Sequence, residues 1–272
     1  MYRIHELHIK RTIMINIYTT PFFTALVGLC LGSFLHALAH RIAFEKPILR
    51  KRSHCPDCDI LITWYQNIPI LSWLALGGRC CNCKALISWI YPFTELVSAI
   101  AFTLVWHYLP LQSPLMGVAY SLFIAALIVA TTTDLHTFTI PQAASLWMAP
   151  VGIAAAAAQL LHISLLQSIF GACVGYISLW LVNFIFKKMR GIDGIGVGDM
   201  ELLCMIGAFL GPVGVWHTVM IASTVGSLWG LLMYLLHKEA NGIVPFGPFL
   251  ALGACCQLFL ARQLWYVFTL GL

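Results

Sequence analysis

Eight apolar runs of membrane-spanning length dominate this chain and leave few folds open to it. They cover about 20–39, 89–109, 115–133, 143–161, 165–186, 200–218, 218–236 and 246–261. Because a helix needs roughly 20 apolar residues to cross the hydrocarbon core of a bilayer, each run predicts a transmembrane helix. Only 9% of the residues are Asp, Glu, Lys or Arg, against about 25% in a soluble domain. The sequence therefore predicts an all-α polytopic integral membrane protein, with the lipid bilayer as its surroundings, and excludes a soluble enzyme.

Basic residues are concentrated in alternate connections between the predicted helices. Residues 41–90 hold seven of the fifteen Lys and Arg residues, and three more follow the fifth run. The connections near 110–114, 162–164 and 211–217 hold none. Since cytoplasmic loops are enriched in Lys and Arg, the basic connections belong in the cytoplasm and the N-terminus lies outside. The net charge of +5 is then a topology signal that requires no nucleic-acid partner.

Three regions are predicted along the chain. Residues 1–40 form an N-terminal tail and the first helix, 41–90 a cytoplasmic metal-binding domain, and 91–272 the remaining transmembrane bundle. The first run has no small-residue cleavage site, so we expect a permanent helix and no signal peptide. G-x-x-x-G steps within the runs predict close packing of helix backbones; they are Gly28/Gly32, Gly171/Gly175, Gly207/Gly211 and Gly226/Gly230.

Two C-x-x-C pairs stand in the polar segment between the first two runs. With 21 residues between the pairs, they supply four thiolates for tetrahedral zinc. Cys81 is an alternative ligand to Cys80, but only Cys80 has the knuckle spacing. A thioredoxin-like redox pair is the alternative chemistry, although the βαβ context is missing and paired cysteines in the reducing cytoplasm more often bind metal. The pattern predicts structural zinc on Cys55, Cys58, Cys80 and Cys83.

Two aspartates stand where predicted helices meet the same side of the membrane. Asp134 closes the third run, and Asp199 opens the sixth in Gly196-Val197-Gly198-Asp199. An even number of predicted crossings separates them, so both carboxylates lie on the cytoplasmic side with the cysteine loop. Ionisable groups at membrane depth are costly and indicate function. The alternative is that each aspartate only caps a membrane helix at the interface.

Two converging carboxylates in a low dielectric share one proton and titrate as a pair. In an aspartic protease the ionised partner takes a proton from water, while the protonated partner polarises the scissile carbonyl. Gly196 and Gly198 support such a site because glycine lets the backbone approach closely and enter a helix. The sequence therefore predicts a peptidase with Asp134 and Asp199 as its catalytic pair.

Taken in order, the motifs resemble the type IV prepilin peptidase family, over about Gly32 to Leu250. They are Gly32-Ser33-Phe34-Leu35 with Arg41, Ser53-His54-Cys55-Pro56-x-Cys58, Asn67-Ile68-Pro69-Ile70-Leu71-Ser72-Trp73, Gly78-Arg79-Cys80-x-x-Cys83, Tyr91-Pro92 with Glu95, Asp134 with Ile140-Pro141, Gly196-Val197-Gly198-Asp199, and Pro245-Phe246-Gly247-Pro248-Phe249. G-x-G-D alone also occurs in presenilin-type proteases. The order of the motifs, together with the cysteine pairs, makes the resemblance specific to the prepilin peptidase family.

The resemblance implies a bacterial inner-membrane enzyme with two activities. It would cleave prepilins or pseudopilins after a Gly at the cytoplasmic boundary, in pilus or type II secretion systems, and methylate the new N-terminal residue with S-adenosylmethionine. Asp134 and Asp199 match the catalytic pair, and the four cysteines match the zinc ligands of a domain tied to methylation. Glu95, Gly78 and Arg79 are candidates for methyl transfer. The alternative for Glu95 is a helix-end acid, and the alternative for Gly78 and Arg79 is a turn with a basic surface.

Three positions depart from the family pattern. His36 stands where Asn is common, Gln142 where Asp often follows Ile-Pro, and Glu201 where Lys is usual. None of these changes removes a catalytic aspartate. Three alternative functions remain open: a peptidase without methyltransferase activity, a non-catalytic zinc-ribbon scaffold, and an ion-coupled transporter, against which the lack of repeats weighs.

Overall fold

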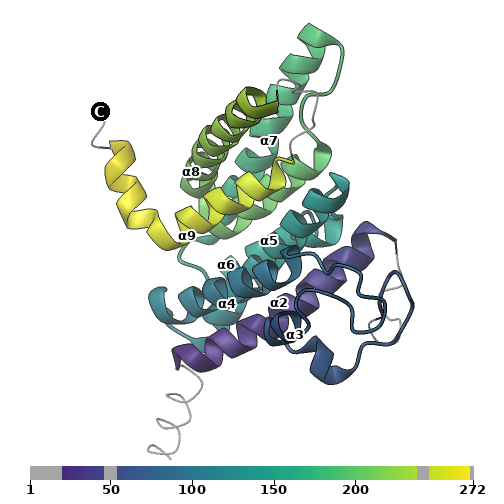
Figure 1. The fold of residues 1–272 in the computed structure, drawn as a ribbon. Coiled ribbons are helices and arrows are strands. Elements are labelled where there is room, and N and C mark those ends of the chain that lie inside the picture. Colours follow the sequence, from purple (N-terminus) through teal and green to yellow (C-terminus); the bar gives the residue numbers. More distant parts are fainter. Residues whose placement is uncertain (1–19, 46–53, 238–244, 270–272) are drawn as a thin grey trace, which may run out of the picture. The chain divides into compact units, whose positions relative to one another are not determined.

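The computed structural model describes residues 20–45, 54–237 and 245–269, and within them the β pairing is limited to two isolated bridges. The elements in chain order are α2 (Pro21–Ala43), η1 (Trp64–Asn67), α3 (Leu71–Ala75), α4 (Ile90–Tyr108), α5 (Pro114–Thr137), η2 (Gln142–Ala144), α6 (Met148–Ala157), α7 (Leu165–Arg190), α8 (Val197–His237) and α9 (Gly247–Thr269) (Figure 1). Each predicted apolar run overlaps one of these helices. The all-α architecture is confirmed for the described residues.

Four of the helices are long and apolar enough to cross a membrane, namely α2, α5, α7 and α8. The sequence predicted eight crossings, and those beyond these four helices stay predictions. The predicted length and the observed length differ most for the run 143–161, because the helix within it, α6, has only ten residues. At 1.5 Å per residue it rises about 15 Å, roughly half the hydrocarbon thickness.

The sixth and seventh runs join into the single element α8, which has 41 residues and one break. Gly211 has φ 73° and ψ −179°, and Pro212 follows it. Only glycine adopts this positive φ without steric cost, and proline supplies no N–H for the preceding turn. The break therefore lies at the start of the connection that the sequence predicts near 211–217.

The chain forms two compact units, Met1–Leu38 with Pro47–Leu111, and Ala39–Lys46 with Gln112–Leu272. In the first unit α2 and α4 pack through Gly28 and Gly32. A Cβ added at Gly28 would lie 2.7 Å from the Ala99 Cα, and one at Gly32 2.6 Å from the Ser98 Oγ. The close packing expected of this G-x-x-x-G step is confirmed.

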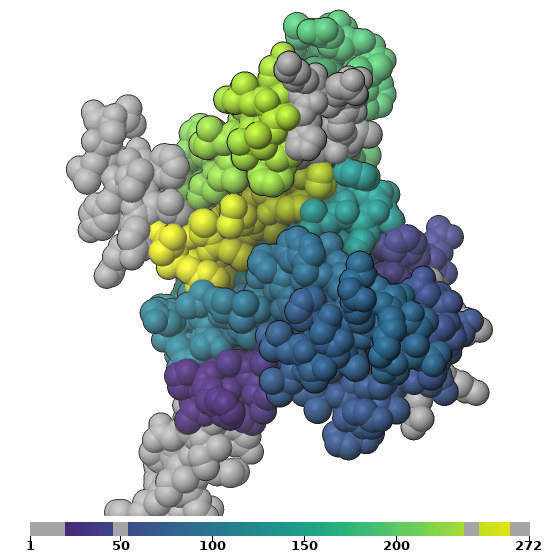
Figure 2. All heavy atoms as spheres, in the orientation of Figure 1, coloured from purple at the N-terminus to yellow at the C-terminus, as the bar shows by residue number. Residues whose placement is uncertain are grey.

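The connection between α2 and α4 holds little regular structure beyond η1 and α3. Its described residues, 54–89, nevertheless form one continuous body of side chains, blue in the space-filling view (Figure 2). The indole N–H of Trp73 donates to the Ile87 carbonyl at 3.1 Å, and the Ile87 N–H donates to the Gly78 carbonyl at 2.7 Å. These bonds tie the segment after α3 to the segment that enters α4.

In the second unit α7 packs on α8, and α9 contacts both α5 and α8. A Cβ added at Gly171 would overlap the Gly207 carbonyl, so the two backbones touch at this crossing. The Ser168 hydroxyl donates to the Ala208 carbonyl at 2.6 Å across the same contact. Phe123 of α5 stacks on Phe209 of α8 with ring centroids 4.8 Å apart. This packing fixes the first half of α8 against α5, the helix that carries Asp134.

Candidate active site

Asp134 lies in the last turn of α5, three residues before the helix ends. Phe138 terminates the helix in the left-handed conformation, and its N–H donates to the Asp134 carbonyl at 2.9 Å. The Asp134 side chain is only 5% exposed. Its Oδ2 accepts the N–H of Gly247 at 2.9 Å, where α9 begins. This donor and the positive end of the α9 dipole compensate part of the buried negative charge.

Asp199 lies in the first turn of α8 and is half-buried. Its N–H donates to the Gly196 carbonyl at 3.2 Å, which folds the Gly196-Val197-Gly198 segment back on the helix start. The charges of Asp134 and Asp199 are close enough to interact. The structure thus brings together two carboxylates that are 65 residues apart in sequence, at the end of one helix and the start of another.

Ile140 packs between the elements that carry the two aspartates. A Cβ added at Gly198 would lie 3.0 Å from the Ile140 Cβ, and one at Gly247 would lie 3.2 Å from its Cδ1. The Gly247 Cβ would also lie 2.8 Å from the Asp134 Oδ2. Both positions therefore require glycine, because a Cβ at either one would press against the same isoleucine.

A methyl group at either glycine is expected to disturb the aspartates. We expect Gly247→Ala to lower the rate of peptide cleavage about 100-fold, because a displacement near 1 Å at a catalytic group has an effect of that size. Gly198→Ala should act in the same direction through Ile140. Gly230→Ala is the matched control, since its Cβ would meet nothing within 4 Å. Equal rates for Gly247→Ala and Gly230→Ala would contradict this account of the site.

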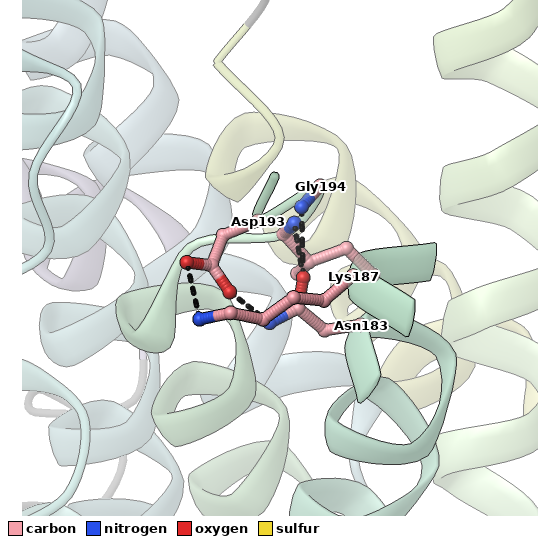
Figure 3. Close-up of polar contacts among 5 residues, drawn as sticks. Asn183, Lys187, Asp193 and Gly194 are labelled. Atoms are coloured by element: carbon pink, nitrogen blue, oxygen red, sulfur yellow. Dashed lines mark hydrogen bonds and ion pairs between the residues drawn. The ribbon is translucent and has the colours of Figure 1, made fainter. Parts of the chain in front are cut away.

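A polar clamp holds the loop that leads into Asp199, as Figure 3 shows. The side-chain oxygen of Asn183 accepts the N–H groups of Gly194 and Ile195 at 2.8 and 3.0 Å. Its amide nitrogen donates to Asp193, whose other oxygen lies 2.9 Å from the Lys187 ammonium. Lys187 and then Asn183 hold the pKa of Asp193 below its ordinary value. The last turns of α7 thus order the residues just before Gly196.

Loss of the clamp is expected to loosen this loop. Asn183→Ala should speed hydrogen exchange at the Gly194 and Ile195 amides about fivefold, since a hydrogen bond contributes about 1 kcal/mol. Folding lowers the pKa of Asp193. The contribution of the Asp193–Lys187 ion pair to the stability of the loop is therefore present at neutral pH, and it is lost as the pH falls through the lowered pKa. Amide exchange measured by mass spectrometry tests this, with Lys188→Ala as the control. Unchanged exchange in Asn183→Ala would contradict the clamp.

The sulfur atoms of Cys55, Cys58, Cys80 and Cys83 lie within 4.8 Å of one another. Cys55 and Cys83 are 3.8 Å apart, and Cys58 and Cys80 are 3.9 Å apart. Zinc–sulfur bonds of about 2.3 Å in a tetrahedron put the sulfurs about 3.8 Å apart. These four cysteines could therefore hold a zinc ion. Cys81 is exposed and does not belong to the cluster, so the geometry favours Cys80 over Cys81 as the ligand at this knuckle.

Both knuckles fold in the same way. The N–H of Cys55 donates to the Ile60 carbonyl at 3.0 Å, and that of Cys80 to the Ala85 carbonyl at 2.8 Å. N–H groups of Asn82 and Cys83 hold the pKa of the Cys80 thiol at about 6. The thiolate is the form that binds metal, so these backbone donors favour the metal-binding form of Cys80.

Comparison with known proteins identifies the family. A model described as the bacterial peptidase A24 N-terminal domain matches residues 26–109, and one described as the type IV leader peptidase family matches residues 121–231. The prepilin leader peptidase/N-methyltransferase of Stutzerimonas stutzeri is 32% identical over 88% of this chain and 90% of its own length. The chain belongs to the type IV leader peptidase family.

Other relatives agree with this assignment. The prepilin leader peptidase/N-methyltransferase of Pseudomonas aeruginosa is 33% identical over 89% of this chain and 90% of its own length. A relative from Escherichia coli named type 4 prepilin-like proteins leader peptide-processing enzyme is 32% identical over 88% of this chain and 94% of its own length. No solved structure matches the chain. Relatives of this chain are thus named for both prepilin processing and methyl transfer.

Two of the three departures from the family pattern contact each other in this chain. The side-chain amide of Gln142 donates to the Glu201 carboxylate at 3.2 Å. The third departure, His36, is 1% exposed and lies 3.2 Å from the Thr94 hydroxyl within the first unit. No sequence pattern indicated that Gln142 and Glu201 are partners, since 59 residues separate them.

The residues named for methyl transfer have identifiable structural positions. Glu95 is buried in α4, and its carboxylate accepts the Ile70 N–H at 2.7 Å. Gly78 has φ 67°, and a Cβ there would lie 2.9 Å from the Trp73 ring. Arg79 is exposed and pairs through its backbone with Leu86. These contacts make Glu95 more than a helix-end acid, because it holds the segment before α3, whereas a chemical role for all three stays a prediction.

Proposed function

We propose that this chain is an aspartic endopeptidase of the bacterial cytoplasmic membrane that removes the basic leader from prepilin or pseudopilin precursors. The observation that carries the proposal is the meeting of Asp134 and Asp199 at the end of α5 and the start of α8. The names of the relatives give the substrate class. Gly196 and Gly198 support the site by letting the backbone enter α8 beside Ile140.

The proposed mechanism uses the two carboxylates as an acid–base pair with one shared proton. The ionised carboxylate takes a proton from water as the water oxygen attacks the scissile carbonyl carbon, and the protonated carboxylate donates to the carbonyl oxygen. The tetrahedral intermediate then breaks its C–N bond: the leaving nitrogen takes a proton from one carboxyl group, and the other carboxylate takes a hydroxyl proton from the intermediate, which restores the shared proton. The products are a leader with a new carboxyl terminus and a pilin with a new amino terminus.

The topology we propose has eight transmembrane crossings, with the aspartates and the cysteine loop on the cytoplasmic side. The concentration of basic residues in 41–90 supports this orientation. A precursor with a basic leader in the cytoplasm and an apolar helix in the bilayer would present its cleavage site at that boundary. Residues 1–40, 41–90 and 91–272 would then be the first helix, the zinc-binding domain and the peptidase domain.

Methyl transfer is the second activity that we propose, using S-adenosylmethionine as the methyl donor. When bound, this cofactor supplies an electrophilic methyl group to the new N-terminal amine. Cys55, Cys58, Cys80 and Cys83 would hold the structural zinc that organises the domain. Glu95, Gly78 and Arg79 border the same segment of the first unit and are the candidates to position the amine or the cofactor.

Product analysis with purified protein tests the proposal. The chain, reconstituted in lipid vesicles, is incubated with a synthetic precursor that carries a basic leader and the start of an apolar helix. We expect a single cut at the leader–helix boundary and, with the methyl donor present, a gain of one methyl on the new amine. Cleavage without methylation would indicate a peptidase whose zinc loop is only structural. An intact precursor would favour the non-catalytic scaffold.

A further inference from the structure

Glu201 is a third acidic residue beside the candidate active site, and its contacts set it apart from the other two. It follows Asp199 by two residues in α8 and is only 5% exposed. Its two oxygens accept hydrogen bonds from the Gln142 amide and from the Ser145 hydroxyl, each at 3.2 Å. Both donors are neutral. A carboxylate buried among apolar helices is costly unless it is bonded in this way.

Glu201 and Asp199 point to different sides of α8. Residues two apart on a helix are separated by about 200° around its axis. Asp199 therefore faces the meeting point with Asp134, whereas Glu201 faces the segment that follows α5. Glu201 is thus placed to act on the site through that segment and not by contact with the reacting atoms.

The segment in question runs from Ile140 to Ser145 and is held at both ends. Its C-terminal part is bonded to Glu201 through Gln142 and Ser145, and the single hydroxyl hydrogen of Ser145 is shared with the Pro141 carbonyl at 3.1 Å. Its N-terminal residue, Ile140, packs against Gly198 and Gly247. The N–H of Gly247 in turn donates to Asp134. A continuous set of contacts therefore links Glu201 to both aspartates.

We propose that Glu201 is a positioning residue for the peptidase: it holds the Ile140–Ser145 segment so that Ile140 fixes the distance between the α8 start and the Asp134–Gly247 contact. This inference rests on the proposed function, because it assigns Glu201 a part in the geometry of that catalytic pair. The role is mechanical, through hydrogen bonds to Gln142 and Ser145, and does not require Glu201 to touch the substrate.

Steady-state kinetics of precursor cleavage by the full-length protein test this role. Glu201→Ala is expected to lower kcat about 10- to 100-fold with KM unchanged, the size expected for catalytic groups displaced by a fraction of an ångström or more. Glu201→Gln keeps an oxygen for Ser145, and the Gln142 amide can turn to face it, so this variant should recover most of the activity. Rescue by the conservative variant separates positioning from a need for charge.

Further variants distinguish loss of positioning from a general folding defect. Gln257→Ala removes another buried hydrogen bond, that to His217 at 2.6 Å, ten residues along α9 from Gly247, and should leave kcat per folded molecule unchanged. Glu201→Lys alone places an ammonium against the Gln142 amide and should be nearly inactive. Adding Gln142→Asp supplies its counter-charge and should restore activity at least about tenfold.

The outcomes separate this inference from the proposed function. A cleaving wild type with equal kcat in Glu201→Ala would overturn the positioning role alone. A kcat loss in Glu201→Ala that Gln257→Ala matches, or a double variant Gln142→Asp/Glu201→Lys no better than Glu201→Lys, would also overturn it. A wild-type chain that cleaves no precursor would overturn the proposed function and the positioning role with it.

Discussion

Asp134→Asn and Asp199→Asn are each expected to lower the rate of leader removal at least about 10³-fold, the upper part of the range for loss of a general acid or base. Asparagine has nearly the size and shape of aspartate, so the Gly247 N–H at 2.9 Å from Asp134 Oδ2 still finds an acceptor oxygen. The amide cannot accept the proton from water or share a proton with its partner. The loss would therefore come from the chemistry and not from the fold.

The effect should be confined to cleavage. A pilin supplied without its leader should be methylated by both variants at a rate close to that of the wild type, because the candidates for methyl transfer lie in the first unit and the aspartates in the second. Asp59→Asn is the matched control. Asp59 is exposed and has φ 55°, which asparagine tolerates well, so its cleavage rate should not change. Near-normal leader removal by either active-site variant would contradict the catalytic role of the aspartates and would favour the alternative that they only cap membrane helices.

Removal of one knuckle thiolate is expected to have the second-largest effect. Cys80→Ser should reduce the bound metal from about one zinc per chain to almost none, because a structural zinc site needs all four ligands and its binding energy is part of the folding energy. Methyl transfer should then fall more than tenfold, with a smaller loss of cleavage. The Ile87–Gly78 and Glu95–Ile70 contacts depend on the loop that the metal would hold.

Cys81→Ser supplies the control beside it in the chain. Cys81 is exposed and outside the four-sulfur cluster, so its replacement should leave the zinc content and both activities unchanged. Metal analysis of the purified variants by plasma mass spectrometry measures the zinc content directly. Zinc retained in Cys80→Ser, or lost in Cys81→Ser, would contradict the proposed ligand set.

The helical elements and the cysteine cluster could be predicted from the sequence because each has a local signal. Apolar runs of helix length predicted the helices, and the C-x-x-C spacing favoured Cys80 over Cys81, as the structure has it. The G-x-x-x-G steps predicted packing at Gly28 and Gly171, where backbones touch, but a Cβ at Gly230 would meet nothing. A small residue permits close approach without requiring it.

The contacts around the aspartates could not be predicted, because they join residues far apart in sequence. Gly247 donates to Asp134 across 113 residues, and Gln142 donates to Glu201 across 59. The short length of α6 was also missed, since apolar composition does not state where a helix ends. Hydropathy predicts that a segment is apolar and helical, whereas its length and partners depend on the packing of the whole unit.

The most direct test of the central claim is the intact mass of a cognate precursor coexpressed with this chain, beside the Asp134→Asn and Asp199→Asn variants. The account predicts a pilin that has lost its leader and gained one methyl group with the wild type, and an uncut precursor with both variants at equal expression. A precursor that both variants process as well as the wild type would contradict the assignment of Asp134 and Asp199 as the catalytic pair.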